Sequence, residues 1–180
     1  TEVNQYNDKT FNKSFSILDI AKKAGYETYW FSNQGYVGSV DTPITLIANT
    51  ADHATWTKQE LNKKQYDGTL LDYLATVDPN KNNFIIFHFM GSHDNFQTRY
   101  PEEFTIWGTP GKYHLIDNYD NSLAYTDYLL KEIYTYATEH LNLQSLVYFS
   151  DHSTVPDKRR QPNFTDFLTV RIPMFVYLSD

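Results

Sequence analysis

The sequence contains no cysteine, which excludes disulfides, thiolate metal sites and cysteine nucleophiles. It also has no apolar run of about 18 residues and no signal-like start, so this stretch is not expected to span a membrane. Cations are outnumbered: 15 Lys and Arg stand against 22 Asp and Glu, and the formal net charge is -7. Because a general nucleic-acid binder needs surplus cations to neutralise phosphates, the composition argues against that class.

Three common active-site motifs are missing as well. Without a Walker A loop or a Gly-x-Gly-x-x-Gly fingerprint, nucleotide binding by those two routes is set aside. Without a Gly-x-Ser-x-Gly elbow, a hydrolase triad has weak support, although serine, histidine and aspartate all occur.

The residues that are present describe a globular chain with an aromatic interior. Hydrophobic residues make up 41% of the 180 positions and charged residues 21%, which separates the sequence from disordered chains. Aromatic residues reach 17%, so ring faces are expected to fill much of the core and line its clefts. The length fits one domain.

Apolar periodicity predicts alternating helices and strands. Helices are expected at 14–24, 58–75 and 117–140, and strands at 26–31, 83–90, 146–150 and 171–179. Residues 44–48 fit either a short strand or a helical turn, and 49–57 are polar. This order predicts an α/β fold with a largely parallel sheet and flanking helices. Because the chain stops straight after an apolar strand, we expect an incomplete domain.

The stretch Ser145–His152 is an apolar run that ends in an acid and an imidazole. Its four apolar residues, 146–149, are typical of a strand buried on both faces of a parallel sheet. Asp151 and His152 then fall at the carboxyl edge, where ligands and catalytic groups collect in open α/β sheets. A carboxylate beside an imidazole is a pair of metal ligands. The alternative is a strand that simply stops at two polar residues.

A second strand also leads into histidine. His88 alternates with buried neighbours inside the strand, so a hydrogen-bonded core histidine is the favoured interpretation. His93 follows Gly91 and Ser92 in a polar loop, where packing gives no reason for an imidazole, so a functional role is favoured. In one parallel sheet both strands would point the same way, and His93 could converge with Asp151 and His152.

Three consecutive cations, Lys158, Arg159 and Arg160, follow the acid and imidazole pair. In a chain of negative net charge they suggest a site for phosphate or sulfate. The alternative is a solvated basic loop.

Five motifs in order resemble the catalytic domain of the lipid A phosphoethanolamine transferases, in the sulfatase branch of the alkaline phosphatase superfamily. They are Phe87–His93, Arg99–Phe104, Tyr119–Asp127, Tyr148–His152 and Ile172–Asp180. The segment Ser16–Gln34 is similar too, so the likeness covers nearly the whole chain. It implies an incomplete alkaline-phosphatase-like fold, with residues 1–180 as a single domain that forms the C-terminal part of the catalytic domain.

The resemblance implies zinc-dependent transfer of phosphoethanolamine from a phospholipid to a cell-surface glycolipid such as lipid A. The reaction would run through a covalent phospho-threonine, at the periplasmic face of the bacterial inner membrane. By position, Asp151 and His152 match two metal ligands, and His93 matches a histidine that faces the substrate phosphate or a second zinc.

The sequence departs from the family in three respects. The nucleophilic threonine and an acidic zinc ligand belong before the helix at Ser16, and the family's transmembrane domain is absent too. Residues 153–160 replace the family's Gly-Glu-Ser continuation, and no histidine follows His152. The cations at 158–160 would then take over a phosphate contact. We therefore expect this piece alone to bind zinc poorly and not to turn over.

Two alternatives stay open. One keeps the fold and changes the reaction to that of a sulfatase, phosphodiesterase or phosphoglycerol transferase, with Asn33, Gln34 and Tyr36 expected to matter at the cleft rim. The other is a non-catalytic domain that binds an anionic glycan or a protein, which the altered loop after His152 would favour.

Overall fold

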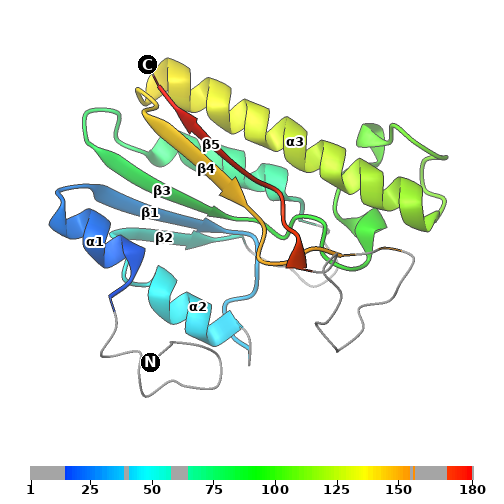
Figure 1. The fold of residues 1–180 in the computed structure, drawn as a ribbon, viewed down its shortest axis with the longest axis horizontal. Coiled ribbons are helices and arrows are strands. Elements are labelled where there is room, and N and C mark those ends of the chain that lie inside the picture. Colours follow the sequence, from blue (N-terminus) through cyan, green and yellow to red (C-terminus); the bar gives the residue numbers. More distant parts are fainter. Residues whose placement is uncertain (1–14, 39–40, 58–64, 155, 157–169, 180) are drawn as a thin grey trace. The chain divides into compact units, whose positions relative to one another are not determined.

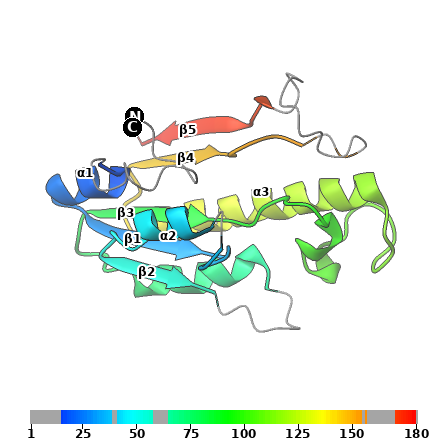
Figure 2. The same ribbon diagram turned by 90° about the horizontal axis from the view of Figure 1, so that it is seen from below.

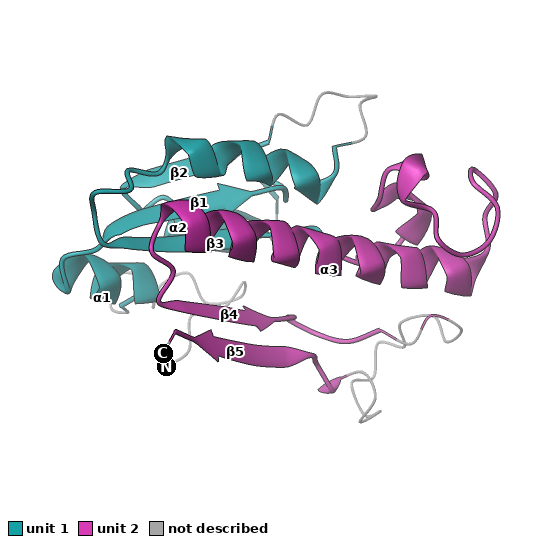
Figure 3. Cartoon of the chain, turned by 90° about the horizontal axis from the view of Figure 1, so that it is seen from above, with its two compact units in different colours: residues 1–90 teal, residues 91–180 magenta. Residues whose placement is uncertain are grey.

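The computed structural model describes residues 15–38, 41–57, 65–154, 156 and 170–179 (Figure 1). The chain divides into two compact units, residues 1–90 and 91–180 (Figure 3). The first contains a parallel sheet with helices, and the second contains a long helix and a two-stranded sheet.

The sheet of the first unit has three parallel strands. They are β1 (Glu27–Ser32), β2 (His53–Trp56) and β3 (Asn83–His88), with β1 in the middle, as Figures 1 and 2 show. In register, Trp30 of β1 lies opposite Ala54 of β2 and Ile86 of β3. The predicted parallel sheet with helices is therefore present. The helices of this unit are α1 (Ile17–Lys23), α2 (Asp41–Ala48) and the 3-10 helix η2 (Asp67–Thr76).

Strand β1 is buried on both of its faces. On one face Trp30 packs with Leu18 of α1 and Ala48 of α2. On the other, the ring of Phe31 lies 5.5 Å from that of Tyr73 in η2. Because side chains alternate along a strand, consecutive apolar residues of β1 serve two layers of helix.

Helix α1 has strong local signals at both ends. It begins after Ser16, whose hydroxyl accepts the Asp19 N–H while the Asp19 carboxylate accepts the Ser16 N–H, a capping box. The cap expected at Ser14 lies outside the described residues. Gly25 ends the helix as predicted, with φ of 87° and its N–H bonded to the Lys22 carbonyl.

The structure decides one segment that the sequence left open and changes the prediction for two others. Residues 44–48, which fitted strand or helix, belong to helix α2. The polar stretch 49–57 contains strand β2, which pairing with β1 stabilises although its own composition is a weak strand signal. Of the helix expected at 58–75, the described part is the 3-10 helix η2, and residues 58–64 lie outside the described ranges.

The second unit is built on helix α3 (Leu115–His140), which was predicted at 117–140. Its other elements are the 3-10 helices η3 (Phe96–Thr98) and η4 (Glu102–Phe104) and strands β4 (Ser145–Phe149) and β5 (Met174–Leu178). No helix in the described ranges is both long and apolar enough to cross a membrane.

Strand β4 forms where it was predicted, but its surroundings differ. It pairs antiparallel with β5 in a two-stranded sheet, rather than lying in the parallel sheet with β3. Val147 is 52% exposed and Phe149 is 65% exposed, so β4 is not buried on both faces. An apolar run specifies a strand, but the elements that cover that strand are set by tertiary structure.

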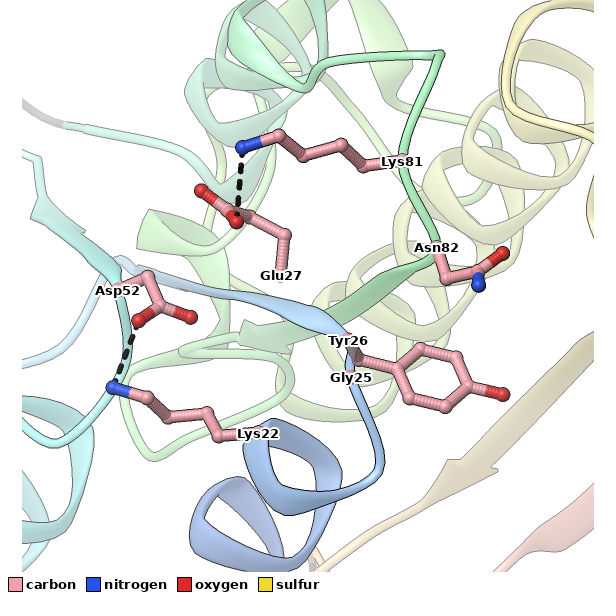
Figure 4. A pocket seen from close by; sticks show the side chains of 7 residues that line it. All are labelled: Lys22, Gly25, Tyr26, Glu27, Asp52, Lys81 and Asn82. Carbon is pink, nitrogen blue, oxygen red and sulfur yellow. Dashed lines mark ion pairs between the residues drawn. The ribbon is translucent and has the colours of Figure 1, made fainter.

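A shallow hollow lies at the amino ends of the parallel strands (Figure 4). Two ion pairs cross it: Lys22 Nζ lies 2.8 Å from Asp52 Oδ1, and Lys81 Nζ lies 3.1 Å from Glu27 Oε2. The other oxygen of Asp52 accepts the Thr28 N–H and hydroxyl at 3.0 and 2.7 Å. Ligands of open α/β sheets bind at the opposite, carboxyl edge, so these contacts fit a role in stability.

Asp52 gives stability a defined dependence on pH. The hydrogen bond from Lys22, followed by those from Thr28, lowers the pKa of Asp52 from 3.8 to about 2. Because the folded pKa lies below the unfolded one, the stabilisation is complete above about pH 4 and is lost as the pH falls towards 2. We expect Asp52→Asn to lower the free energy of unfolding at pH 7 by about 1 kcal/mol.

Denaturant unfolding between pH 7 and pH 2 measures this difference. The wild-type and Asp52→Asn curves should converge at the acidic end, whereas Asp72→Asn, which changes an exposed acid of η2, should follow the wild type throughout. A gap between wild type and Asp52→Asn that persists at pH 2 would contradict the assignment.

Candidate metal and phosphate site

Two polar residues end strands β1 and β3 side by side. Ser32 and His88 are paired in register, and Ser32 Oγ lies 3.1 Å from His88 Nδ1. The His88 ring also contacts the Trp30 ring, with centroids 5.4 Å apart. His88 is therefore the hydrogen-bonded histidine that its position in the strand predicted.

A buried polar network follows at the carboxyl ends of the parallel strands. Asn33 and Asp67 are 2% and 4% exposed, and Asn33 Nδ2 donates to Asp67 Oδ1 at 2.8 Å. The same carboxylate oxygen accepts the Met90 N–H at 2.9 Å, and the Thr57 hydroxyl donates to Asn33 Oδ1 at 2.6 Å. Asn33, expected at a cleft rim, is instead a buried residue that links Thr57 to Asp67 by hydrogen bonds.

The other two residues expected at the rim lie differently. Gln34 donates through Nε2 to the Phe89 carbonyl at 2.6 Å, so it too links the segments after β1 and β3. Tyr36 is largely exposed, and its ring packs edge-on against Trp56.

Asp151 and His152 lie just beyond β4 and face one another. Asp151 Oδ2 and His152 Nε2 are 3.6 Å apart, and the Asp151 side chain is 87% exposed. Asp151 Oδ1 accepts the His152 N–H at 3.0 Å, and the Ser150 hydroxyl donates to the His152 carbonyl at 2.6 Å. Both side chains are thus accessible and held by bonds to near neighbours in the chain.

The geometry of this pair suits zinc. The Ser153 carbonyl lies 3.0 Å from His152 Nδ1. Because a carbonyl can only accept, Nδ1 carries the proton, which in the neutral ring leaves the lone pair on Nε2, the nitrogen that faces Asp151. Two ligands bound about 2.1 Å from one tetrahedral zinc lie about 3.4 Å apart, close to the separation observed.

His93 has an exposed side chain in the loop after β3. In the ranges that the structure describes, no three His, Asp or Glu side chains gather closely enough to hold a metal ion. Asp151 and His152 are therefore brought together, and His93 does not complete a metal cluster with them. The role of His93 stays a prediction, as does that of Lys158, Arg159 and Arg160, which lie outside the described residues.

Sequence reasoning missed the residues that support the His93 loop. Arg99 donates from Nε to the His93 carbonyl at 3.0 Å and from Nη2 to the Asp94 carbonyl at 2.8 Å. Ser122 of α3 lies with its hydroxyl 2.8 Å from that of Ser92. The available signal was a cluster of polar residues on the inner side of α3, where an amphipathic helix would be apolar.

The inner face of α3 is polar in its first turns, and Leu123, an apolar residue of those turns, is 40% exposed. The buried positions are Asn118, Asn121, Ser122, Tyr125, Thr126, Leu129, Ile133 and Ala137. Polar residues occupy the first turns because they bond the segment that precedes the helix.

This architecture is an α/β protein whose candidate site is an acid and an imidazole, Asp151 and His152, placed side by side just beyond a strand. The sulfatase family model matches residues 1–180, and the chain belongs to the sulfatase family.

Phosphoethanolamine transferases are among its relatives, which confirms the resemblance predicted from the motifs. OpgE of Escherichia coli K12, a phosphoethanolamine transferase, is 35% identical over 189 residues, which cover 92% of this chain and 33% of that protein. A putative phosphoethanolamine transferase of Haemophilus influenzae is 34% identical over 154 residues, covering 78% of this chain and 32% of that protein. The chain thus spans about a third of the length of these curated relatives.

A solved structure supports the fold. The C-terminal periplasmic domain of Escherichia coli EptC, in complex with zinc, superposes with a TM-score of 0.77 at 24% identity. The match covers 99% of this chain and 56% of that one. The predicted alkaline-phosphatase-like α/β fold is confirmed.

Zinc titration tests the pair formed by Asp151 and His152. Because two protein donors hold zinc less tightly than three or four, calorimetry on the 180-residue chain should give a dissociation constant above about 1 μM. Asp151→Asn should weaken binding at least about tenfold, since an amide is a poorer zinc ligand than a carboxylate.

Helix α3 offers a matched control. Glu139 and His140 are also an adjacent acid and imidazole, with Oε2 and Nε2 3.8 Å apart, but the His140 ring packs against Tyr136. Glu139→Gln should leave zinc affinity unchanged. Submicromolar affinity in the wild type would contradict the expected weak binding, and equal effects of the two substitutions would contradict the assigned site.

Proposed function

We propose that this chain is part of an enzyme that transfers phosphoethanolamine from a phospholipid to a cell-surface glycolipid such as lipid A. The reaction depends on zinc and passes through a covalent phospho-threonine in the full-length protein. The observation that carries the proposal is the 3.6 Å approach of Asp151 Oδ2 to His152 Nε2, with Nδ1 committed to the Ser153 carbonyl. Similarity to OpgE and to the Haemophilus protein supports the choice of reaction.

The candidate site residues have separate parts in this reaction. A bound zinc would supply Lewis-acid stabilisation of phosphoryl oxygens and activate the nucleophile. Asp151 and His152 would hold the metal through a carboxylate oxygen and an imidazole nitrogen. His93 contacts the substrate phosphate or a second zinc through its exposed imidazole, and Lys158, Arg159 and Arg160 add charge for the phosphate.

The partners and location follow from the reaction. The donor is a phospholipid and the acceptor a glycolipid, so the site works at a membrane surface. The EptC domain is described as periplasmic, and we place this domain likewise, on the periplasmic side of the inner membrane. Residues 1–180 alone do not turn over, since the described part holds no group of three or more side chains that could bind zinc.

The full-length protein and a phospholipid donor with labelled phosphoethanolamine test the proposal. Asp151→Asn and His152→Gln should each lower transfer to lipid A at least about 100-fold, because each removes a direct zinc ligand. Glu139→Gln should stay within about twofold of the wild type, since the side chain lies on the exposed side of α3.

Product analysis distinguishes the related reactions. Transfer of labelled phosphoethanolamine supports the proposal. Release of sulfate from aryl sulfates, or transfer of phosphoglycerol without phosphoethanolamine, would replace it with the corresponding reaction of the same superfamily. Full activity in Asp151→Asn would remove the assigned metal pair.

The basic residues after His152 make a separate prediction. If Arg159 and Arg160 contact the transferred phosphate, the double change to Ala should raise the KM for the phospholipid donor by about tenfold. Arg171→Ala, at an exposed cation of the same chain, is the control. An unchanged KM in the Arg159 and Arg160 variant would eliminate the phosphate contact.

A further inference from the structure

The loop that carries His93 combines an exposed imidazole with a fixed backbone. The backbone carbonyls of His93 and Asp94 accept hydrogen bonds from the Arg99 guanidinium, at 3.0 and 2.8 Å. Gly91 has a positive φ of 55°, a conformation that side chains other than glycine rarely adopt. Such a loop holds its histidine in a defined place although the ring itself lies in solvent.

Helix α3 supplies the contact next to this histidine. Ser122 is 1% exposed, and its hydroxyl lies 2.8 Å from the Ser92 hydroxyl and 2.7 Å from the Tyr119 carbonyl. Ser92 is the residue before His93. A buried hydroxyl with two partners is costly to move, because a shift leaves polar groups unpaired.

The turns of α3 around Ser122 are held by contacts with the segment that precedes the helix. Asn118 and Asn121 both donate to the Tyr100 hydroxyl, at 2.8 and 3.2 Å. The Phe96 ring packs against that of Tyr119, with centroids 5.0 Å apart. These contacts join α3 to Phe96 and Tyr100, which precede and follow Arg99 in the sequence. Ser122 therefore projects from a part of the helix that is held in place within the second unit.

We propose that Ser122 is a positioning residue for His93, acting through the hydroxyl of Ser92. The inference rests on the proposed function, in which His93 contacts the substrate phosphate. A displacement of about 1 Å in a positioned group can cost about 100-fold in rate, so a loosened loop lowers turnover even though Ser122 never touches substrate.

Two substitutions separate positioning from general stability. Ser122→Ala and Thr126→Val each remove one buried hydroxyl from α3, and the Thr126 hydroxyl bonds the Ser122 carbonyl within the helix. Both should destabilise the protein to a similar extent. In the full-length protein Ser122→Ala should lower kcat about tenfold with little change in KM, whereas Thr126→Val should change kcat less than twofold.

A double-mutant cycle tests the route through Ser92. If the two hydroxyls act together, Ser92→Ala should lower kcat about as much as Ser122→Ala, and the double variant should be no slower than either single one. Multiplying effects in the double variant would overturn the proposal, as would equal kcat losses in Ser122→Ala and Thr126→Val.

An NMR measurement on the 180-residue chain keeps the positioning claim distinct from the proposed reaction. The imidazole signals of His93 should shift in Ser122→Ala and Ser92→Ala and stay in place in Thr126→Val. Signals of His93 that are unchanged in Ser122→Ala would refute positioning even if transfer is observed. A shift of those signals in the 180-residue chain, with no transfer of phosphoethanolamine by the full-length protein, would support positioning and refute only the reaction.

Discussion

The carboxylate of Asp67 is the group on which the carboxyl edge of the parallel sheet depends. It is buried, and a carboxyl group away from water is stable only when hydrogen bonds replace its hydration. Its Oδ1 accepts from Asn33 and from the Met90 N–H, and Thr57 extends the chain of bonds through Asn33. These partners follow β1, β3 and β2 respectively. One acid therefore fixes the exits of three strands, and the exit of β3 leads directly into the His93 loop.

In the second unit, the side-chain amide of Asn121 plays the corresponding part by satisfying backbone hydrogen-bonding groups. Asn121 Oδ1 accepts the N–H groups of Ile106 and Trp107, and Nδ2 donates to the Trp107 carbonyl. A side-chain amide carries a donor and an acceptor, so it can pair with a stretch of backbone much as another strand would. The first half of α3 consequently buries polar residues that bind a loop, while its second half buries Leu129, Ile133 and Ala137 in the usual apolar manner.

This division explains which features the sequence predicts. Helix α3, strands β1 and β3 and the end of α1 at Gly25 follow from periodicity and from one glycine, which are local signals. Strand β2 and the surroundings of β4 were missed or misjudged, because pairing partners and covering layers are set by distant residues. Asn33 was expected at a rim for a similar reason: its partners Thr57 and Asp67 are far away in the sequence, so its burial has no local signature.

The candidate site shows the same contrast between contacts to near neighbours in the sequence and contacts to distant residues. Asp151 and His152 take their geometry from Ser150, Ser153 and each other, all within four consecutive residues. The adjacent acid and imidazole are therefore visible in the sequence, while their role as metal ligands stays a prediction. The His93 loop takes its geometry from Arg99 and from Ser122, which lies 30 positions away. Within the described residues, different contacts therefore hold the Asp151 and His152 pair and the His93 loop. Changes on the inner face of α3 are expected to affect the placement of His93 and not that of the pair, because none of the hydrogen bonds described for Asp151 and His152 comes from that face.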